Sequence, residues 1–384
     1  MARFAIEGWR FLAHSYALVN QYQCLEMLRR AELTIYHRDL PFYLPRWVSM
    51  RGVLGAADES LLEALPPPPP EPADVTYRIA FPFDLRPSAS RRTVVFMTAE
   101  SHCPPSFIRG GVSIREALAA SDVSIVTPSN WSRDRLIQAG APAERISIVP
   151  HGVDTRVYHP AAADARAALR ARAGLAENFV FLHVGAMTDN KNIPLLLGAF
   201  AQVARKHPHA RLLLKGVDHL YGSNDFLSAA IGLLEPRDRA AIEGRIIYYG
   251  GIWPVARMAE LYHVADAYVT PYACEGFNLP ALEAAACGLP LLCTRGGPTD
   301  EFTTPNFSLP IDSVLHSCGP DQSALNVNPN SLLEQMSRIV EDDGFRITAG
   351  SAGPDFVASR FTWRHIVNQL LSILLPGAKS PVIP

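Results

Sequence analysis

The sequence predicts an α/β fold made of two doubly wound domains. Short apolar runs alternate with segments of helical spacing along most of the chain. The runs are continuous rather than alternately polar and apolar, as strands of a parallel sheet covered on both faces require. The 384 residues are sufficient for two domains. Ligands of such domains bind at the carboxyl ends of the strands, so candidate functional residues are sought there.

The first domain is expected over residues 1–160. Helical patterns are predicted at 18–31 and 115–120. Strand-like runs occur at 3–9, 75–81, 93–100 and 124–128. The segment LPPPPPEP at 65–72 is predicted to be an exposed loop, because proline fixes φ and lacks the backbone N–H.

The second domain is expected over residues 161–359, where the alternation is regular. The segment 310–330 is interpreted as loop from its Ser, Asn, Pro and Gly content. The last pattern, 363–375, is an amphipathic helix. The predicted strands are 179–185, 211–216, 245–251, 266–272 and 290–297, and the predicted helices are 193–207, 254–265 and 278–288.

Composition excludes several classes of protein. The net charge is −2, from 35 basic and 37 acidic residues, so there is no electrostatic reason to expect a nucleic-acid partner. The 6 cysteines form no CxxC pair, which argues against a disulfide framework or a structural zinc site and favours a reducing compartment. No 18-residue apolar run is present, and Arg3, Glu7 and Arg10 interrupt the start of the chain. A soluble cytoplasmic protein is predicted.

The strongest chemical signal follows the predicted strand 266–272. Asn278 is a plausible helix N-cap, Pro280 falls in the first turn and Gly288 ends the helix. Glu275 then lies on the loop before the helix and Glu283 about one turn inside it. Two carboxylates beside a helix N-terminus suit a ligand with both hydroxyls and phosphates. The alternative for Glu283 is a structural one, because the helix dipole favours Glu in a first turn.

The segment EGFNLPALEAAACGLP, with 7 residues between Glu275 and Glu283, resembles the E-x7-E motif of the retaining glycosyltransferases of family 4. Segments 130–160, 179–200 and 287–302 resemble the family in the same register, and the similarity runs from about 94 to 302. The resemblance implies the GT-B fold, in which two Rossmann-like domains face a central cleft. It also implies that the C-terminal helix, 360–384, packs back on the first domain.

The resemblance implies a donor site for a nucleotide-diphosphate sugar. Lys191 matches the lysine that contacts the diphosphate, in the loop after Gly185. Glu275 would hold hydroxyls of the transferred sugar, and Glu283 those of the ribose. Ile252 and Trp253 lie where the family contacts the nucleobase, although an aromatic residue there also serves packing. Backbone groups that would cradle phosphate and sugar belong to Gly276, Phe277, Asn278 and Leu279.

Two positions depart from the family pattern. Ala186 stands where relatives usually carry arginine, and loss of that charge-assisted contact costs on the order of 1.5 to 3 kcal/mol if nothing replaces it. Lys215, at the end of the next strand, is a candidate replacement, the alternative being a solvated lysine. Asn278 stands where many relatives have glycine.

The first domain resembles the family less closely. It lacks the Gly-Gly turn after its first strand, where His14, Ser15 and Tyr16 would line the acceptor side instead. Glu100 and His102 are the two candidates for the family's histidine near the reacting sugar, with His102 as the catalytic candidate. Asn130 follows another strand end and would border the acceptor. Each of these has the alternative of an ordinary loop residue.

The predicted function is that of a metal-independent retaining hexosyltransferase. It would transfer a sugar from a nucleotide sugar to a hydroxyl of a glycan, a lipid or a small molecule. No cofactor is expected, and no Asp-x-Asp motif supplies metal ligands. A non-catalytic GT-B subunit that binds a sugar nucleotide or glycan is the alternative, favoured by Ala186 and the missing Gly-Gly turn. Peripheral attachment at the inner membrane face stays open, because such enzymes often use lipid-linked acceptors.

Overall fold

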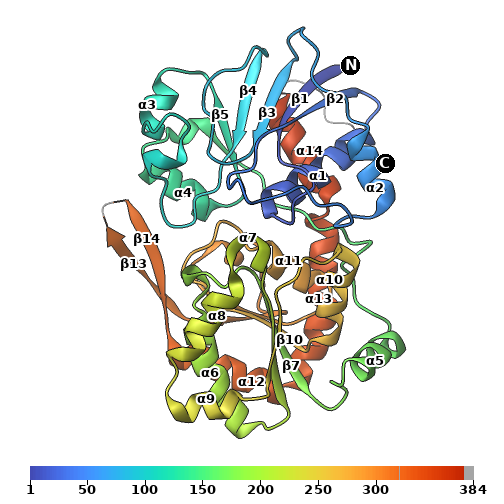
Figure 1. The fold of residues 1–384 in the computed structure, drawn as a ribbon, viewed down its shortest axis with the longest axis vertical. Helices are drawn as coiled ribbons and strands as arrows, with labels where there is room; N and C mark the ends of the chain where they lie inside the picture. The colour runs from blue at the N-terminus through green and yellow to red at the C-terminus, as the bar shows by residue number, and fades with distance from the viewer. Residues whose placement is uncertain (320, 376–384) are drawn as a thin grey trace. The chain divides into compact units, whose positions relative to one another are not determined.

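The computed structural model describes residues 1–319 and 321–375, and its chain divides into two units. Unit 1 comprises residues 1–152, 319, 321–322 and 361–375. Unit 2 comprises residues 153–318 and 323–360. The predicted helix 360–384 extends in part beyond the described residues. Figure 1 shows the course of the chain through both units.

Unit 1 contains a six-stranded parallel sheet with the order β2-β1-β3-β4-β5-β6. Its strands are β1 (Ala2–Gly8), β2 (Leu33–Asp39), β3 (Val75–Ile79), β4 (Arg92–Phe96), β5 (Ser124–Thr127) and β6 (Ile146–Ile148). Its helices are α1 (Ser15–Leu28), α2 (Ala56–Glu63), α3 (Ile114–Ala119), α4 (Asn130–Gln138) and α14 (Trp363–Leu374), with 3-10 turns at Pro105–Phe107 and Ala143–Arg145. The loop at 65–72 is largely exposed, as predicted.

The last described helix packs within unit 1. The ring of Trp363 on α14 stacks on that of Tyr22 on α1, with centroids 5.3 Å apart. Gln369 Nε2 donates to Ile148 O at 3.0 Å. Gly152 permits this approach, because a Cβ there would lie 2.9 Å from Trp363 atoms. The amphipathic segment 363–375 thus packs on α1.

Unit 2 contains a second six-stranded parallel sheet, with the order β12-β11-β10-β7-β8-β9. Its strands are β7 (Phe179–Val184), β8 (Ala210–Lys215), β9 (Ile246–Tyr249), β10 (Ala267–Thr270), β11 (Leu291–Thr294) and β12 (Ser308–Ile311). Its helices are α5 (Ala163–Arg172), α6 (Ile193–Lys206), α7 (Asp218–Tyr221), α8 (Ser223–Gly232), α9 (Pro236–Ile242), α10 (Val255–Val264), α11 (Leu279–Ala286), α12 (Pro329–Glu341) and α13 (Asp343–Arg360), with 3-10 turns at Asp189–Lys191 and Pro298–Glu301.

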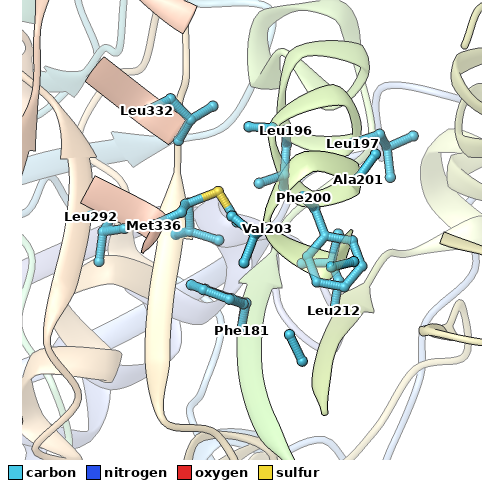
Figure 2. Packing of buried hydrophobic residues seen from close by; sticks show 14 of the residues in the cluster. Phe181, Leu196, Leu197, Phe200, Ala201, Val203, Leu212, Leu292, Leu332 and Met336 are labelled. Atoms are coloured by element: carbon cyan, nitrogen blue, oxygen red, sulfur yellow. The ribbon is translucent and has the colours of Figure 1, made fainter. Parts of the chain in front are cut away.

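One face of this sheet carries a continuous apolar core. Phe181 of β7 and Leu212 of β8 lie beneath Phe200 of α6, and Met336 of α12 packs beside them (Figure 2). These side chains are fully buried. The apolar runs predicted as strands therefore supply the core, which confirms the predicted doubly wound α/β architecture of two domains with parallel sheets.

The prediction of loop at 310–330 is wrong. After β12, the chain forms β13 (Ser313–Gly319) and β14 (Gln322–Val327), which pair in a separate two-stranded sheet. Residue 320, which fell in the predicted loop, lies outside the described residues. Most of β13 is exposed, so its sequence carries no core-facing apolar pattern, and pairing with β14 determines its conformation.

Candidate functional site

Most of the predicted donor residues of unit 2 follow the neighbouring parallel strands β7 and β10. Ala267 of β10 pairs with Phe181 of β7, and Tyr268 with Leu182. The loops 185–192 and 271–278 therefore leave the sheet at the same carboxyl edge. Each loop leads directly into a helix, α6 or α11. This is the edge at which doubly wound sheets bind ligands.

Asparagine side chains tie these two loops together. Asn192 Nδ2 donates to Pro271 O at 2.8 Å, and Asn190 Nδ2 donates to Cys274 O at 3.1 Å. Ala273 N donates to Asn190 O at 2.8 Å. Asn192 has φ +53°, a left-handed conformation that asparagine tolerates better than most residues. The position of Lys191, between the two asparagines, is consequently fixed relative to the second loop.

Lys191 and Glu275 meet across the loops. The Lys191 ammonium donates to Glu275 Oε1 in a short ion pair. Their side chains are only 14% and 10% exposed, so water screens the pair weakly. The structure thus brings together the two residues that the sequence assigns to diphosphate and sugar hydroxyls. An ammonium suits phosphate oxygens and a carboxylate suits hydroxyl donors.

Asn278 begins helix α11, as the sequence predicts. Its Oδ1 accepts from Ala281 N at 3.2 Å, and its Nδ2 donates to Thr270 Oγ1 at 3.1 Å. Its φ is +76°, which explains why glycine also suits this position. Phe277 is buried with its ring 4.9 Å from that of Phe302, so its side chain belongs to the core. Gly276 is buried and Leu279 is half-buried at the same helix start.

Glu283 lies in α11 with two tyrosines around its carboxyl group. Tyr262 OH donates to Glu283 Oε2 at 2.6 Å, and Tyr158 also bonds to the carboxyl group. Burial raises the pKa of Glu283 to about 7, because the two hydroxyl donors only partly offset desolvation of the carboxylate. The arrangement leaves Glu283 near its titration midpoint at neutral pH. The sequence analysis missed both tyrosines, which precede the motif on separate elements.

Lys215 is buried at the end of β8 rather than solvated. Its ammonium donates to Gly251 O at 2.7 Å and lies 5.6 Å from the centroid of the Trp253 ring. Burial lowers the pKa of Lys215 to about 8. Lys215 O accepts from Gly185 N at 3.0 Å, so this residue adjoins the loop that contains Ala186. A second cation therefore lies beside the loop that lacks arginine.

Trp253 packs against two neighbouring side chains. The guanidinium of Arg257 lies 3.8 Å from the centroid of the Trp253 ring, and the Tyr249 ring centroid is 4.7 Å away. Ile252 and Trp253 are both half-buried. Part of the Trp253 ring is therefore covered by these neighbours, and its remaining exposed surface is available to a ligand.

The predicted acceptor-side residues fall into two groups in unit 1. Trp131 Nε1 donates to Glu100 O at 2.6 Å, which ties the loop with Glu100 and His102 to the start of α4, where Asn130 lies. His102 is half-buried, with Ser101 Oγ 2.8 Å from its Nδ1. This group follows β4 and β5, which are neighbours in the sheet.

The second group follows β1. His14 caps helix α1, its Nδ1 accepting from Tyr16 N at 3.1 Å. Burial lowers the pKa of His14 to about 4, so the ring is neutral at physiological pH. Ser15 is exposed, and the Tyr16 ring lies 5.3 Å from that of Phe96, at the end of β4. This ring contact brings the group after β1 next to β4, the strand that precedes Glu100 and His102.

The described residues hold neither a metal-binding cluster nor a membrane-spanning helix. In residues 1–319 and 321–375, no set of three or more His, Cys, Asp and Glu side chains is placed to hold a metal ion. The helices in this part of the chain are all too short or too polar to span a membrane.

Sequence comparison shows that part of the chain is similar to a family of glycosyltransferases. Residues 166–341 match the profile of the glycosyl transferases group 1. A D-inositol 3-phosphate glycosyltransferase of Segniliparus rotundus is 33% identical over 250 residues, which are 63% of this chain and 50% of that protein. A GDP-mannose-dependent alpha-(1-6)-phosphatidylinositol monomannoside mannosyltransferase of Mycolicibacterium smegmatis is 26% identical over 262 residues, which are 66% of this chain and 63% of that protein. The chain thus spans between half and two thirds of the length of these curated relatives.

Solved structures with the same fold cover nearly the whole chain. Anabaena HepE in complex with UDP and glucose superposes with a TM-score of 0.71 at 17% identity, covering 97% of this chain and 99% of HepE. WaaG, a glycosyltransferase of lipopolysaccharide biosynthesis, gives 0.63 at 14% identity, covering 98% of this chain and 100% of WaaG. The fold is GT-B. Residues 166–341, within unit 2, are similar to the glycosyl transferases group 1, and this stretch contains the E-x7-E segment of Glu275 and Glu283.

Proposed function

We propose that the protein is a retaining, metal-independent glycosyltransferase that moves a hexosyl group from a nucleotide-diphosphate sugar to a hydroxyl acceptor. The observation that carries the proposal is the ion pair between Lys191 and Glu275. It joins the groups required for diphosphate and for sugar hydroxyls at one sheet edge, next to the start of α11. The match of residues 166–341 to the glycosyl transferases group 1 supports the same reaction class.

In the proposed reaction, the diphosphate takes the place of Glu275 as partner of Lys191. Glu275 is then available to accept hydrogen bonds from the sugar. Lys191, together with the N-terminus of α11, stabilises the negative charge that develops on the leaving diphosphate. Lys215 supplies a second positive charge beside the loop with Ala186. The acceptor hydroxyl attacks from the face that the diphosphate leaves, and its proton passes to a leaving phosphate oxygen. His102 and Glu100 are assigned to the acceptor side.

The relatives narrow the substrates that we propose. HepE has been solved with UDP-glucose, which supports a nucleoside diphosphate hexose as donor. The names of the two curated relatives specify D-inositol 3-phosphate and a phosphatidylinositol mannoside, which supports a hydroxylated ring compound, free or lipid-linked, as acceptor. A lipid-linked acceptor would bring the protein to the inner face of the membrane as a peripheral enzyme.

Isothermal titration against UDP-glucose, GDP-mannose and ADP-glucose tests the donor site. We expect one nucleotide class to bind, and binding to be lost in both Lys191→Ala and Glu275→Ala. Lys206→Ala, an exposed lysine at the end of α6, is the matched control and should bind like the parent. If none of the three binds, or if both variants bind like the parent, the assignment of the donor site is wrong.

Turnover distinguishes the enzyme from a binding subunit. Purified protein that binds a nucleotide sugar should also hydrolyse it slowly in the absence of acceptor, releasing nucleoside diphosphate. Tight binding with no release of diphosphate, with or without a panel of glycosides, would instead establish the non-catalytic GT-B subunit that Ala186 favours.

A further inference from the structure

Unit 1 contains a cavity of about 640 Å³ outside the predicted site residues. It lies at the carboxyl ends of β1 and β2, the edge at which such sheets bind ligands. Arg10 follows β1, Asp39 ends β2, and Phe42 and Ser49 come from the next loop. Arg51 and Glu63 complete the wall from the segment before α2 and from its last residue.

One wall of the cavity contains the carboxylate of Asp39, which is hydrogen-bonded to the buried Arg10. Asp39 accepts from Arg10 Nε at 2.8 Å and from Arg10 Nη2 at 2.6 Å. His37 Nδ1 lies 3.4 Å from Asp39 Oδ1, and the His37 side chain is wholly buried. The side chain of Asp39 is 57% exposed, whereas that of Arg10 is 8% exposed. The carboxylate is therefore fixed in orientation while it remains open to the cavity.

The tautomer of His37 is determined by a second buried residue, Asn20. Asn20 Nδ2 donates to Trp9 O at 2.9 Å, which fixes the orientation of its amide. The same group lies 2.9 Å from His37 Nε2, so Nε2 accepts and the proton of the neutral ring is on Nδ1, toward Asp39. Burial lowers the pKa of His37 to about 3, which keeps the ring neutral. Arg10 thus orients the carboxylate of Asp39, and the neutral His37 ring lies beside it.

Another part of the cavity wall contains a turn in which Phe11 has a strained backbone conformation. Phe11 has φ +56°, an unusual conformation for a bulky residue. Its N–H donates to Gln21 Oε1 at 2.8 Å, and its carbonyl accepts from Met50 N at 2.6 Å. The Arg51 guanidinium lies 3.4 Å from the centroid of the Phe11 ring and pairs with Glu63 at 2.9 Å. Strain of this kind persists where the surroundings over-determine it, and it clusters at ligand sites.

The charges around the cavity balance. Arg10 and Arg51 face Asp39 and Glu63, so the lining has no net charge. It nevertheless offers donors from Arg51 and Ser49 and acceptors from two carboxylates, beside the half-buried Phe42 ring. Alternating donors and acceptors around an apolar surface match a neutral ring that carries several hydroxyls. A phosphate, by contrast, would need an excess of positive charge.

We infer that this cavity, lined by Arg10, Asp39, Phe42, Ser49, Arg51 and Glu63, binds a neutral polyhydroxylated ring, and that it holds part of the glycosyl acceptor. The assignment to the acceptor rests on the proposed transferase function. The binding chemistry follows from the cavity alone. Asp39 accepts hydrogen bonds from ring hydroxyls, Arg51 and Ser49 donate to ring oxygens, and Phe42 contacts the apolar face of the ring.

Saturation-transfer NMR on the full chain tests the binding step, with methyl α-D-glucopyranoside and myo-inositol as probes and inorganic phosphate as competitor. We expect saturation transfer to at least one polyol, with no displacement by equimolar phosphate. Asp39→Asn and Arg51→Gln should each weaken the affinity by at least about tenfold, the loss typical of a charge-assisted hydrogen bond. Asp122→Asn alters an exposed carboxylate just before β5 and should bind like the parent.

Three results would overturn the inference: no transfer to either polyol in the parent, displacement by phosphate, or parental affinity in both variants. Arg51→Gln keeps the test valid if Asp39→Asn misfolds, because Arg51 is 52% exposed. Titration with nucleotide sugars separates the two proposals. Polyol binding without any nucleotide-sugar binding would refute the transferase function and the acceptor role together. Unchanged acceptor KM in a catalytically active Arg51→Gln variant would refute the acceptor role alone.

Discussion

Replacing Glu283 with glutamine removes a carboxyl group that is costly to ionise in the folded protein. Its pKa is raised to about 7 from an ordinary value of 4.5, so between these two pH values the folded state holds a proton that the unfolded chain has released. Stability consequently falls as the pH rises from about 4.5 to 7, and above 7 the full cost remains. Glutamine keeps the shape and an oxygen that can accept from Tyr262 without carrying a charge.

The magnitude follows from the pKa difference. A shift of 2.5 units, the difference between 7 and 4.5, corresponds to about 3 kcal/mol at alkaline pH. At pH 5 most of this cost is absent, because the folded carboxyl group is still protonated. The stability gained through Glu283→Gln should therefore be about 2 kcal/mol greater at pH 8 than at pH 5. For a unit of this size, that difference moves the melting temperature by roughly 4 to 8 °C.

Scanning calorimetry at pH 5, 6, 7 and 8 measures the effect, with parent and variant compared at each pH. Glu260→Gln removes an exposed carboxylate from α10 in the same unit and should show no such trend. A Glu283→Gln difference that is constant across this range would refute the reasoning. So would a variant less stable than the parent at pH 8, because that result would mean the ionised carboxylate is stabilising.

The remaining predictions concern the donor site. Lys191→Met and Glu275→Gln should each cost about 3 kcal/mol of unfolding free energy, because each removes the opposite charge from a poorly hydrated ion. The double variant should recover a large part of the loss, and additive losses in urea titrations would show that the two residues are not coupled. Asn278→Ala should lower the free energy of unfolding by about 1 to 2 kcal/mol, because the variant loses the helix cap and places a Cβ at φ +76°. Asn278→Gly should lower it clearly less. Equal losses in the same urea titrations would contradict this account of the cap. Affinity for the nucleotide diphosphate should fall as the pH rises through 8, because the Lys215 ammonium, with its pKa of about 8, loses its proton there. Lys215→Arg should remove that part of the fall. Calorimetric titration between pH 7 and 9 measures the affinity, and the same dependence of affinity on pH in both proteins would exclude Lys215 as a diphosphate ligand.

Local patterns in the sequence predicted the strands β7 to β11 and the helices α6, α10 and α11 of unit 2, but not its other helices or β12. The strands β7, β8, β10 and β11 are largely buried apolar runs, a pattern that burial on both faces of a parallel sheet requires. The run of β9 was also predicted, although β9 is a half-buried edge strand. The start of α11 was equally predictable, because Asn278 caps it through an interaction with Ala281 only three residues away. The strand β2 and the helix α2 were not identified. β2 is an edge strand whose residues Leu33–Asp39 are only partly buried, so its apolar pattern is weak.

Some residues of the candidate site were predicted from the sequence, but their ion pairing and pKa values depend on the tertiary structure. Lys191 and Glu275 are 84 positions apart in the chain and meet only because β7 and β10 are neighbours in the sheet. No local pattern encodes that adjacency. For the same reason the sequence did not associate Tyr262 with Glu283, and the raised pKa of Glu283 followed only from the packing around it.

Unit 1 shows the same division between local and non-local information. His14, Tyr16 and Asn130 are recognisable as residues that follow strands, because each comes shortly after an apolar run. The carboxylate of Asp39 becomes a candidate ligand only when Arg10, 29 residues earlier, and His37 are packed behind it. The sequence alone thus determined the strands β1, β3 to β5 and β7 to β11, the cap of α11 and the E-x7-E motif, which depend on neighbouring residues. The tertiary structure decided which charged groups are paired, buried and accessible, because those properties depend on contacts between residues that are distant in the chain.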